Sequence, residues 1–224
     1  MNPALTSLLA ASIAFVGTHF AMSHPLRGMM VRLAGDKGFL GLYSLVSFAT
    51  FGWMIVAFRA SPPGIVSSSA GVAAVVSLLT LVAMVLFAGS LFGNPALPDT
   101  PVEKVSAARA TGVFCVTRHP MMWGFALWAV AHILLVPNGR TLIVAGAILI
   151  LALLGAHLQD RKKEALLGTA WQGWARQTRF WPQWHKLAFA GWKPWVGGGA
   201  LWLAATWAHG AMAGIPAGLW PWLD

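Results

Sequence analysis

Six stretches of this sequence contain no Asp, Glu, Lys or Arg and consist mainly of apolar residues. They run over 3–23, 39–58, 70–93, 121–136, 141–158 and 195–216. A bilayer core about 30 Å thick is crossed by a helix of roughly 20 apolar residues, so most of the stretches are long enough to cross it. The sequence therefore predicts an all-α membrane helix bundle of about six transmembrane helices, in a single domain over residues 1–224.

The composition excludes an exterior that faces water. Hydrophobic residues make up 58% of the chain and charged residues only 9%, whereas soluble domains average about 25% charged residues. The 13 Trp against one Tyr fit a membrane protein, because Trp favours the headgroup boundary. We assign the net charge of +9 to loops that contact anionic lipid headgroups, and we expect no nucleic-acid partner.

The basic residues predict the orientation of the chain. Thirteen of the 15 fall in the first, third and fifth connections: Arg27, Arg32, Lys37, Lys104, Arg109, Arg118, Arg161, Lys162, Lys163, Arg176, Arg179, Lys186 and Lys193. Only Arg59 and Arg140 fall on the other side. By the positive-inside rule, these three connections face the cytoplasm of a cell-membrane protein and both chain ends lie outside. The first stretch has no basic residues before it, so we expect a retained span rather than a signal peptide.

The segment TRHPMMWGFALWAVAH, residues 117–132, places ionisable groups at both ends of the fourth stretch. Only 16 residues separate Pro120 from Pro137, a helix of roughly 24 Å, which is shorter than the hydrocarbon core. Arg118 snorkelling to lipid phosphate, beside an interfacial His119, is one interpretation. The other is that Arg118 and His119 line a cavity as candidate catalytic residues.

Four of the seven histidines, His19, His132, His157 and His209, fall inside apolar stretches or at their ends. Each one alone is explained by a hydrogen-bonded core or interfacial imidazole. No pair has the i, i+4 spacing of a zinc helix, and Cys115 is the single cysteine, so we expect no structural zinc site. Histidines on separate helices of a bundle are, however, what axial haem ligation needs.

Other chemistry is sparse inside the spans. None of the six acidic residues lies within an apolar stretch, which argues against a proton-relay transporter. The glycines at 197–199, and Gly210 with Gly214, predict close helix packing rather than phosphate binding.

Two segments together resemble the NnrU family of bacterial multi-pass membrane proteins. They are GVFCVTRHPMMWGFALWAVAHILLVPNG and THFAMSHPLRGMMVRLAGDKGFLGLYSLVSF. The resemblance covers about residues 5–182, which leaves the stretch at 195–216 as an extra C-terminal span. The family is associated with nitrite and nitric oxide reduction genes (denitrification) and is related to the haem-dependent zeta-carotene isomerase.

This resemblance implies a haem b cofactor with His19 and His132 as its iron ligands. Arg27 and Arg118 are the natural partners for the haem propionates. The implied function is in nitrogen-oxide metabolism or on a lipophilic substrate. In the isomerase a cysteine lies three residues before the second histidine, and here that position is Ala129, so thiolate chemistry there is not expected.

The predicted topology places the two implied ligands at different depths. His19 lies near the cytoplasmic face, and His132 lies roughly 20 Å from His119 along a helix. Either the first span is shifted outward, or the fourth helix lies obliquely, or His19 works with His119 or His24.

A more distant resemblance is to isoprenylcysteine carboxyl methyltransferase-like proteins. RHPMMWG is similar to their Arg-His-Pro turn, and LGTAWQGWARQTRFWP to a later segment with Gly168, Trp171 and Trp174 at the matching positions. It implies methyl transfer from S-adenosylmethionine, with Arg118, His119 and Asp160 at the cofactor end. Gln159 replaces one acid of that pattern, which weakens this alternative. A non-catalytic assembly or transport component is the third interpretation.

Overall fold

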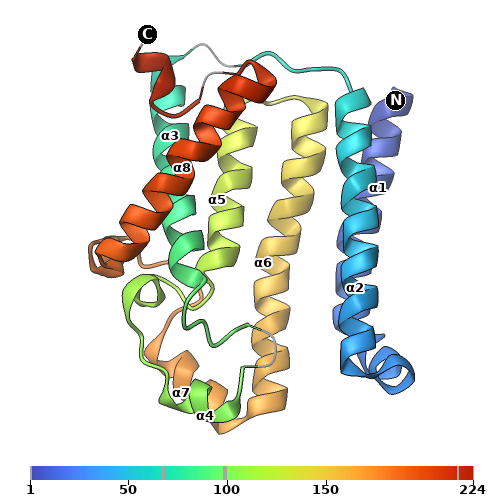
Figure 1. Cartoon of the computed structure of the whole chain (residues 1–224), viewed down its shortest axis with the longest axis vertical. Coiled ribbons are helices and arrows are strands. Elements are labelled where there is room, and N and C mark those ends of the chain that lie inside the picture. Colours follow the sequence, from blue (N-terminus) through green and yellow to red (C-terminus); the bar gives the residue numbers. More distant parts are fainter. Residues whose placement is uncertain (1, 67–68, 98–99, 216, 224) are drawn as a thin grey trace. The chain divides into compact units, whose positions relative to one another are not determined.

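The computed structural model describes residues 2–66, 69–97, 100–215 and 217–223, and every regular element in these ranges is a helix (Figure 1). The all-α prediction is confirmed. The long helices are α1 (Pro3–Ser23), α2 (Arg27–Ala60), α3 (Ala70–Ser90), α5 (Pro120–Leu135), α6 (Gly139–Leu167) and α8 (Trp192–Ala213). The short elements are α4 (Val102–Ala107), α7 (Thr169–Gln177), η1 (Gly112–Cys115), η2 (Trp184–Ala190) and η3 (Trp220–Trp222).

Each predicted stretch coincides with most of one long helix. α3 ends at Ser90 rather than at Gly93, and two helices extend well beyond their predicted bounds. α2 begins at Arg27 rather than Phe39, and α6 continues to Leu167 rather than Leu158. The first basic connection is therefore helical, not a loop. Gly35, whose φ of 68° breaks the helix, separates Arg27 and Arg32 from the apolar part of α2. Pro216, where the sixth stretch was predicted to end, lies outside the described residues.

Local sequence signals explain where the long helices begin. Asn2 caps α1, because its side-chain oxygen accepts a hydrogen bond from the Ala4 N–H at 2.9 Å, and Pro3 follows at the first helical position. Asn138 caps α6 in the same way, by accepting from the Thr141 N–H at 3.0 Å. The predicted turn 137–139 is thus the point at which α5 ends and α6 begins.

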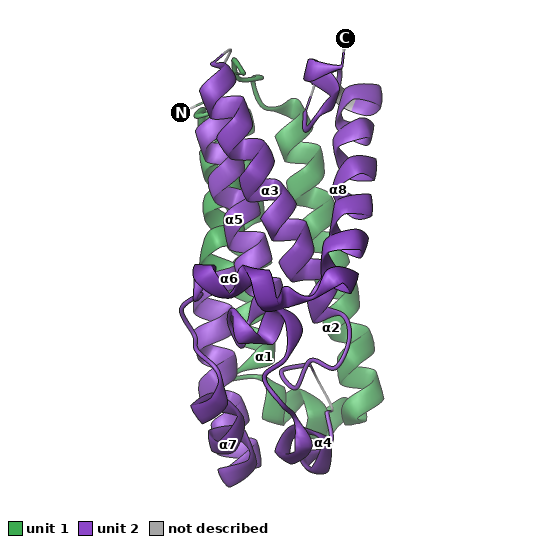
Figure 2. Cartoon of the chain, turned by 90° about the vertical axis from the view of Figure 1, so that its left-hand side faces the viewer, with its two compact units in different colours: residues 1–66, 136–151 green, residues 67–135, 152–224 purple. Residues whose placement is uncertain are grey.

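The chain divides into two compact units, which Figure 2 colours separately. Unit 1 consists of residues 1–66 and 136–151, and unit 2 of residues 67–135 and 152–224, so α6 contributes to both. In unit 1, α1 packs on α2 through Leu8, Phe15 and Met54. Ile148 of α6 packs against the same core.

In unit 2, α3 contacts both α5 and α8, and glycines make these contacts close. A Cβ at Gly124 of α5 would lie 2.8 Å from the Ala83 carbonyl oxygen, and one at Gly198 of α8 would lie 2.5 Å from the Val85 Cα. The packing role predicted for the glycines at 197–199 is therefore confirmed at Gly198. It is wrong for Gly210, which has open space around it, and Gly214 instead ends α8 in the left-handed conformation.

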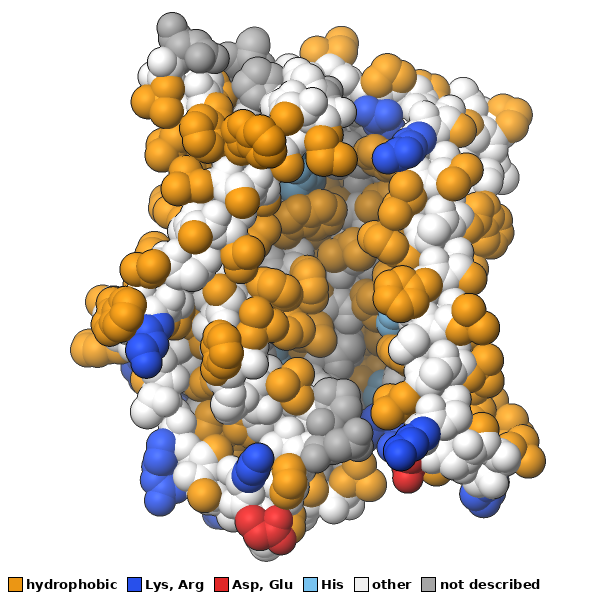
Figure 3. Space-filling model, in the orientation of Figure 1, with side chains coloured by type: hydrophobic (Ala, Val, Ile, Leu, Met, Phe, Trp, Pro, Cys, Tyr) orange, Lys and Arg blue, Asp and Glu red, His pale blue; other side chains and the backbone are white. Residues whose placement is uncertain are grey.

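The outer faces of the long helices are apolar, as Figure 3 shows for one face of the molecule. Large hydrophobic side chains are strongly exposed, among them Leu45 (66%), Phe48 (75%) and Val56 (68%). A surface of this kind is favourable against lipid and unfavourable against water. Within the described residues, α1, α2, α3 and α6 are long and apolar enough to cross a membrane, and α5 is a shorter apolar helix of 16 residues. The chain is a membrane-embedded helical protein, and six spans stay a prediction.

Candidate functional site

The residues just before α5 are fixed to the chain that follows α7. The Thr117 hydroxyl is fully buried and donates to the Phe180 carbonyl oxygen at 2.7 Å. The Arg118 N–H donates to the Arg179 carbonyl at 2.8 Å. The same Thr117 oxygen accepts from the His119 N–H at 3.2 Å, which orders the first residues before the helix. Two segments about 60 residues apart in sequence are thereby held as one support for the Arg118 and His119 side chains.

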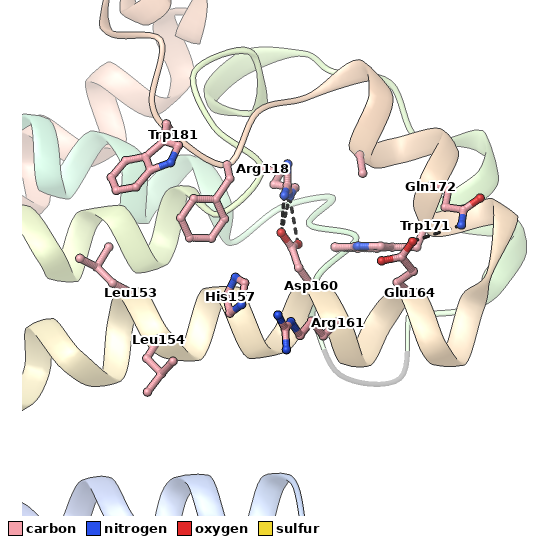
Figure 4. Close-up of a pocket in the computed structure, with 12 residues that line it drawn as sticks. Arg118, Leu153, Leu154, His157, Asp160, Arg161, Glu164, Trp171, Gln172 and Trp181 are labelled. Atoms are coloured by element: carbon pink, nitrogen blue, oxygen red, sulfur yellow. Dashed lines mark hydrogen bonds and ion pairs between the residues drawn. The ribbon is translucent and has the colours of Figure 1, made fainter.

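Arg118 donates to the carboxylate of Asp160, which lies on α6 (Figure 4). His119 donates to the same carboxylate. Nε of Arg118 lies 2.9 and 2.8 Å from the two carboxylate oxygens, and Nη2 also donates to Oδ2. Nε2 of His119 lies 2.7 Å from Oδ1. Because a carboxylate only accepts, this imidazole nitrogen carries the hydrogen. The side chains of Arg118, Asp160 and His119 are 16%, 14% and 1% exposed. We call these three residues the Asp160 cluster.

Aromatic rings enclose the Asp160 cluster. The Cζ of Arg118 lies 5.6 Å from the centre of the Phe180 ring, within the range of a cation–π contact. The same ring meets the His119 ring edge-on, with centres 5.7 Å apart. Trp171 of α7 is 2% exposed, and the centre of its ring lies 6.5 Å from that of His119, so α7 supplies a buried aromatic neighbour of the cluster. The apolar surroundings strengthen the electrostatic attraction within it.

A pocket of roughly 750 Å³ lies beside the Asp160 cluster, within unit 2 (Figure 4). One face of α6 forms its floor, from Leu153, Leu154, His157, Asp160, Arg161 and Glu164. α7 and the residues after it supply the other walls, from Trp171, Gln172, Ala175, Phe180 and Trp181. Arg118 and Asp160 reach this space. His119 is not among the lining residues, and it is joined to the pocket through its hydrogen bond to Asp160.

The two histidines named by the family resemblance share one arrangement. Nδ1 of His19 lies 2.7 Å from the Phe15 carbonyl oxygen, and Nδ1 of His132 lies 2.8 Å from the Trp128 carbonyl oxygen, each four residues earlier. A carbonyl oxygen only accepts, so Nδ1 carries the hydrogen in both rings and Nε2 of a neutral ring is the basic nitrogen. Histidines that ligate metals are commonly fixed by such a bond through the other ring nitrogen. The donor chemistry of both rings therefore fits an iron ligand.

These two histidines do not share a unit, since His19 belongs to unit 1 and His132 to unit 2. Within unit 2, the ring of His132 has the His209 ring of α8 as a neighbour, with centres 6.0 Å apart. Arg27 begins α2 in unit 1, where its Nη2 lies 4.0 Å from an Asp36 oxygen. In the described part of the chain, no three or more His, Cys, Asp or Glu residues form a group that could hold a metal ion.

Several site residues were not expected from the sequence. The backbone carbonyls of Arg179 and Phe180 hold the 117–118 segment, and no side-chain pattern signals a backbone acceptor. Arg161 belongs to the site because it shares the pocket face of α6 with His157 and Asp160. The signal that could have found Arg161 is the i, i+3 and i+4 spacing of His157, Asp160 and Arg161, which places all three on one helical face.

The sequence matches the family model described as NnrU protein over residues 7–217. No curated protein and no solved structure matches it. The match extends past residue 182, where the resemblance read from the motifs ends, and includes all of α8. Because it covers most of the sequence, the chain belongs to the NnrU family.

Proposed function

We propose that this member of the NnrU family is a haem b-binding protein of the bacterial inner membrane, with His19 and His132 as iron ligands. The observation that carries the proposal is their shared arrangement, an Nδ1–H donated to the carbonyl four residues earlier. It fixes each ring and leaves Nε2 as the basic nitrogen, the form that binds iron. Nε2 of His19 has the Ser47 hydroxyl as a neighbour at 3.3 Å, and His19 as an iron ligand would give up this contact.

The basic residues near these ligands have proposed roles of their own. Arg27 is the proposed propionate partner in unit 1, since its contact with Asp36 is long and its side chain is 33% exposed. Arg118 is the corresponding partner in unit 2, although two of its nitrogens are already bound by Asp160. Bound haem supplies redox and gas-ligand chemistry. The proposed reaction is in nitrogen-oxide metabolism or on a lipophilic substrate, with Arg118 and His119 at the reacting end.

The test is the absorption spectrum of purified variants made with ample haem supply. His19→Gln and His132→Gln are expected to remove or shift the Soret band while the protein stays folded in the membrane, because amides are poor haem ligands. His185→Gln is the matched control, since it removes an exposed imidazole outside the proposed site. If the two site variants keep the wild-type spectrum, the ligand assignment is wrong.

A second candidate is methyl transfer from S-adenosylmethionine, and one observation favours it. Arg118, His119 and Asp160, which the more distant resemblance places at the cofactor end, are joined in one cluster, and two of them line the pocket. Calorimetric titration of the purified protein with S-adenosylmethionine tests this candidate. Saturable binding that Asp160→Asn abolishes supports it, and the absence of binding heat excludes it.

A further inference from the structure

We propose that the pocket beside Asp160 binds one molecule of an anionic phospholipid from the surrounding bilayer. The ligand is a phosphate-headed amphiphile whose head lies against Arg161 and His157 and whose chain lies against Leu153, Leu154 and Trp181. All of these residues line one pocket within unit 2. The proposal does not depend on haem binding.

The pocket has an apolar end and a polar end. Leu153 and Leu154 lie within the apolar stretch that ends at residue 158, whereas Arg161 and Glu164 lie beyond it. From Leu153 to Glu164 the α6 axis advances by about 16 Å. The volume of roughly 750 Å³ lies within the range of small-molecule sites. A ligand that fills this space is therefore amphiphilic, with its head at the Glu164 end.

The charges at the polar end favour an anionic head. The Asp160 carboxylate is occupied by Arg118 and His119, and Glu164 accepts from Nε2 of Gln172 at 3.1 Å. Arg161, by contrast, has no hydrogen bond or ion pair to any residue that the structure describes. Both acids therefore have hydrogen-bond partners, whereas the N–H groups of Arg161 remain available. A guanidinium with available N–H groups can donate to two oxygens of one phosphate.

His157 adds a second donor on the same side of α6. It lies four residues before Arg161, so the two side chains project from neighbouring turns of one face. Its ring is exposed and meets the edge of Phe180 at 6.5 Å, with no hydrogen bond in the described ranges. Nη1 of Arg118 is likewise unused by Asp160. Arg161, His157 and Arg118 thus bring three nitrogen groups to the lining of one pocket, as ligands for one phosphate.

The apolar residues at the opposite end of the pocket suit an acyl chain. The Trp181 side chain is 69% exposed and Leu154 is 43% exposed, and both border the pocket. A hydrocarbon chain covers apolar surface of this kind, as bilayer lipid does on the outer faces of the long helices. A free phosphate compound without a chain leaves this surface uncovered, so the geometry favours the lipid over its soluble headgroup.

Native mass spectrometry of the detergent-solubilised full chain tests the proposal, with phosphatidylglycerol, phosphatidylcholine and glycerol 3-phosphate as probes. We expect one retained phosphatidylglycerol per chain, weaker retention of phosphatidylcholine, and no displacement by glycerol 3-phosphate. Arg161→Gln is expected to lower phosphatidylglycerol retention by about fivefold, the effect of one partly exposed ion pair. Arg176→Gln is the matched control, because it removes an exposed cation next to Ala175 that does not line the pocket.

Filling the pocket gives an independent arm that does not change charge. Gln172→Trp and Ala175→Trp place an indole in the space from α7, and both are expected to lower retention of phosphatidylglycerol severalfold. Two positions are used so that one misfolded variant does not decide the result. Equal losses in Arg161→Gln and Arg176→Gln, unchanged retention in both Trp variants, or displacement by glycerol 3-phosphate would each overturn the proposal.

Discussion

The Nε2 of His119 lies 2.7 Å from Oδ1 of Asp160, although 41 positions separate the two residues in sequence. This contact joins the start of α5 to the C-terminal part of α6, and Arg118 binds the same carboxylate from the neighbouring position. Arg118 and His119, which precede the fourth stretch, therefore belong to a largely buried ionic cluster and not merely to a membrane boundary. The cluster fixes one wall of the pocket.

Asp160→Asn leaves the Arg118 and His119 donors with one neutral acceptor oxygen in place of a carboxylate, and puts an NH2 donor where the second oxygen was. Asp160→Asn is expected to lower the free energy of unfolding by about 3 kcal/mol, since a partly buried cation then lacks its anionic partner. The measurement is thermal unfolding of the purified protein in detergent. Glu164→Gln is the control, because it removes an exposed carboxylate of the same helix, and its change stays within about 0.5 kcal/mol. Equal effects of the two substitutions would show that the cluster adds no stability.

Removing the Thr117 hydroxyl is expected to lower the free energy of unfolding. Thr117→Val keeps the branched shape but leaves the Phe180 carbonyl and the His119 N–H without their partner, at a cost of about 1–3 kcal/mol. Thr18→Val is the matched control, because the Thr18 hydroxyl donates only to carbonyls of its own helix. The comparison is made by thermal unfolding, and a larger loss in Thr18→Val contradicts the proposed support of the 117–118 segment.

Close packing of α3 and α8 depends on Gly198. A Cβ there lies 2.5 Å from the Val85 Cα, so Gly198→Ala is expected to destabilise the protein by about 1–3 kcal/mol through backbone displacement. Gly199→Ala meets no atom within 4 Å and is expected to be neutral, or more stable by up to about 1 kcal/mol from helix propensity. Denaturation in detergent distinguishes the two variants. Destabilisation by Gly199→Ala instead would contradict the packing in which Gly198 is the glycine of α8 that faces α3.

The charge distribution predicts which connections face the cytoplasm. Reporter domains fused after Arg59 are expected to be active outside, and those fused after Lys104 or Lys163 in the cytoplasm, because 13 of the 15 basic residues fall on one side. Alkaline phosphatase and green fluorescent protein fusions give opposite readouts. A cytoplasmic signal after Arg59 would reverse the topology and the location of the pocket.

Apolar length alone predicted the helices, because a run of charge-free residues admits few structures in a bilayer. The start of α2 was predicted wrongly, since the basic segment around Arg32 looks like a loop by charge alone. The Asp160 cluster was only partly foreseen. Arg118, His119 and Asp160 were candidates from the motif, but the hydrogen bonds from Thr117 to the residues after α7 join distant segments through backbone carbonyls. No sequence spacing encodes such acceptors.

The haem proposal rests on the hydrogen bond from Nδ1 of each histidine to a backbone carbonyl, which leaves Nε2 as the basic nitrogen. Its most direct test is the absorption spectrum and haem content of the wild-type protein, purified from cells with ample haem supply. The account predicts a Soret band and about one haem b per chain, as two axial ligands from one chain require. A purified, folded protein without a Soret band or extractable haem would contradict it, and His132 would then be a packing histidine beside His209.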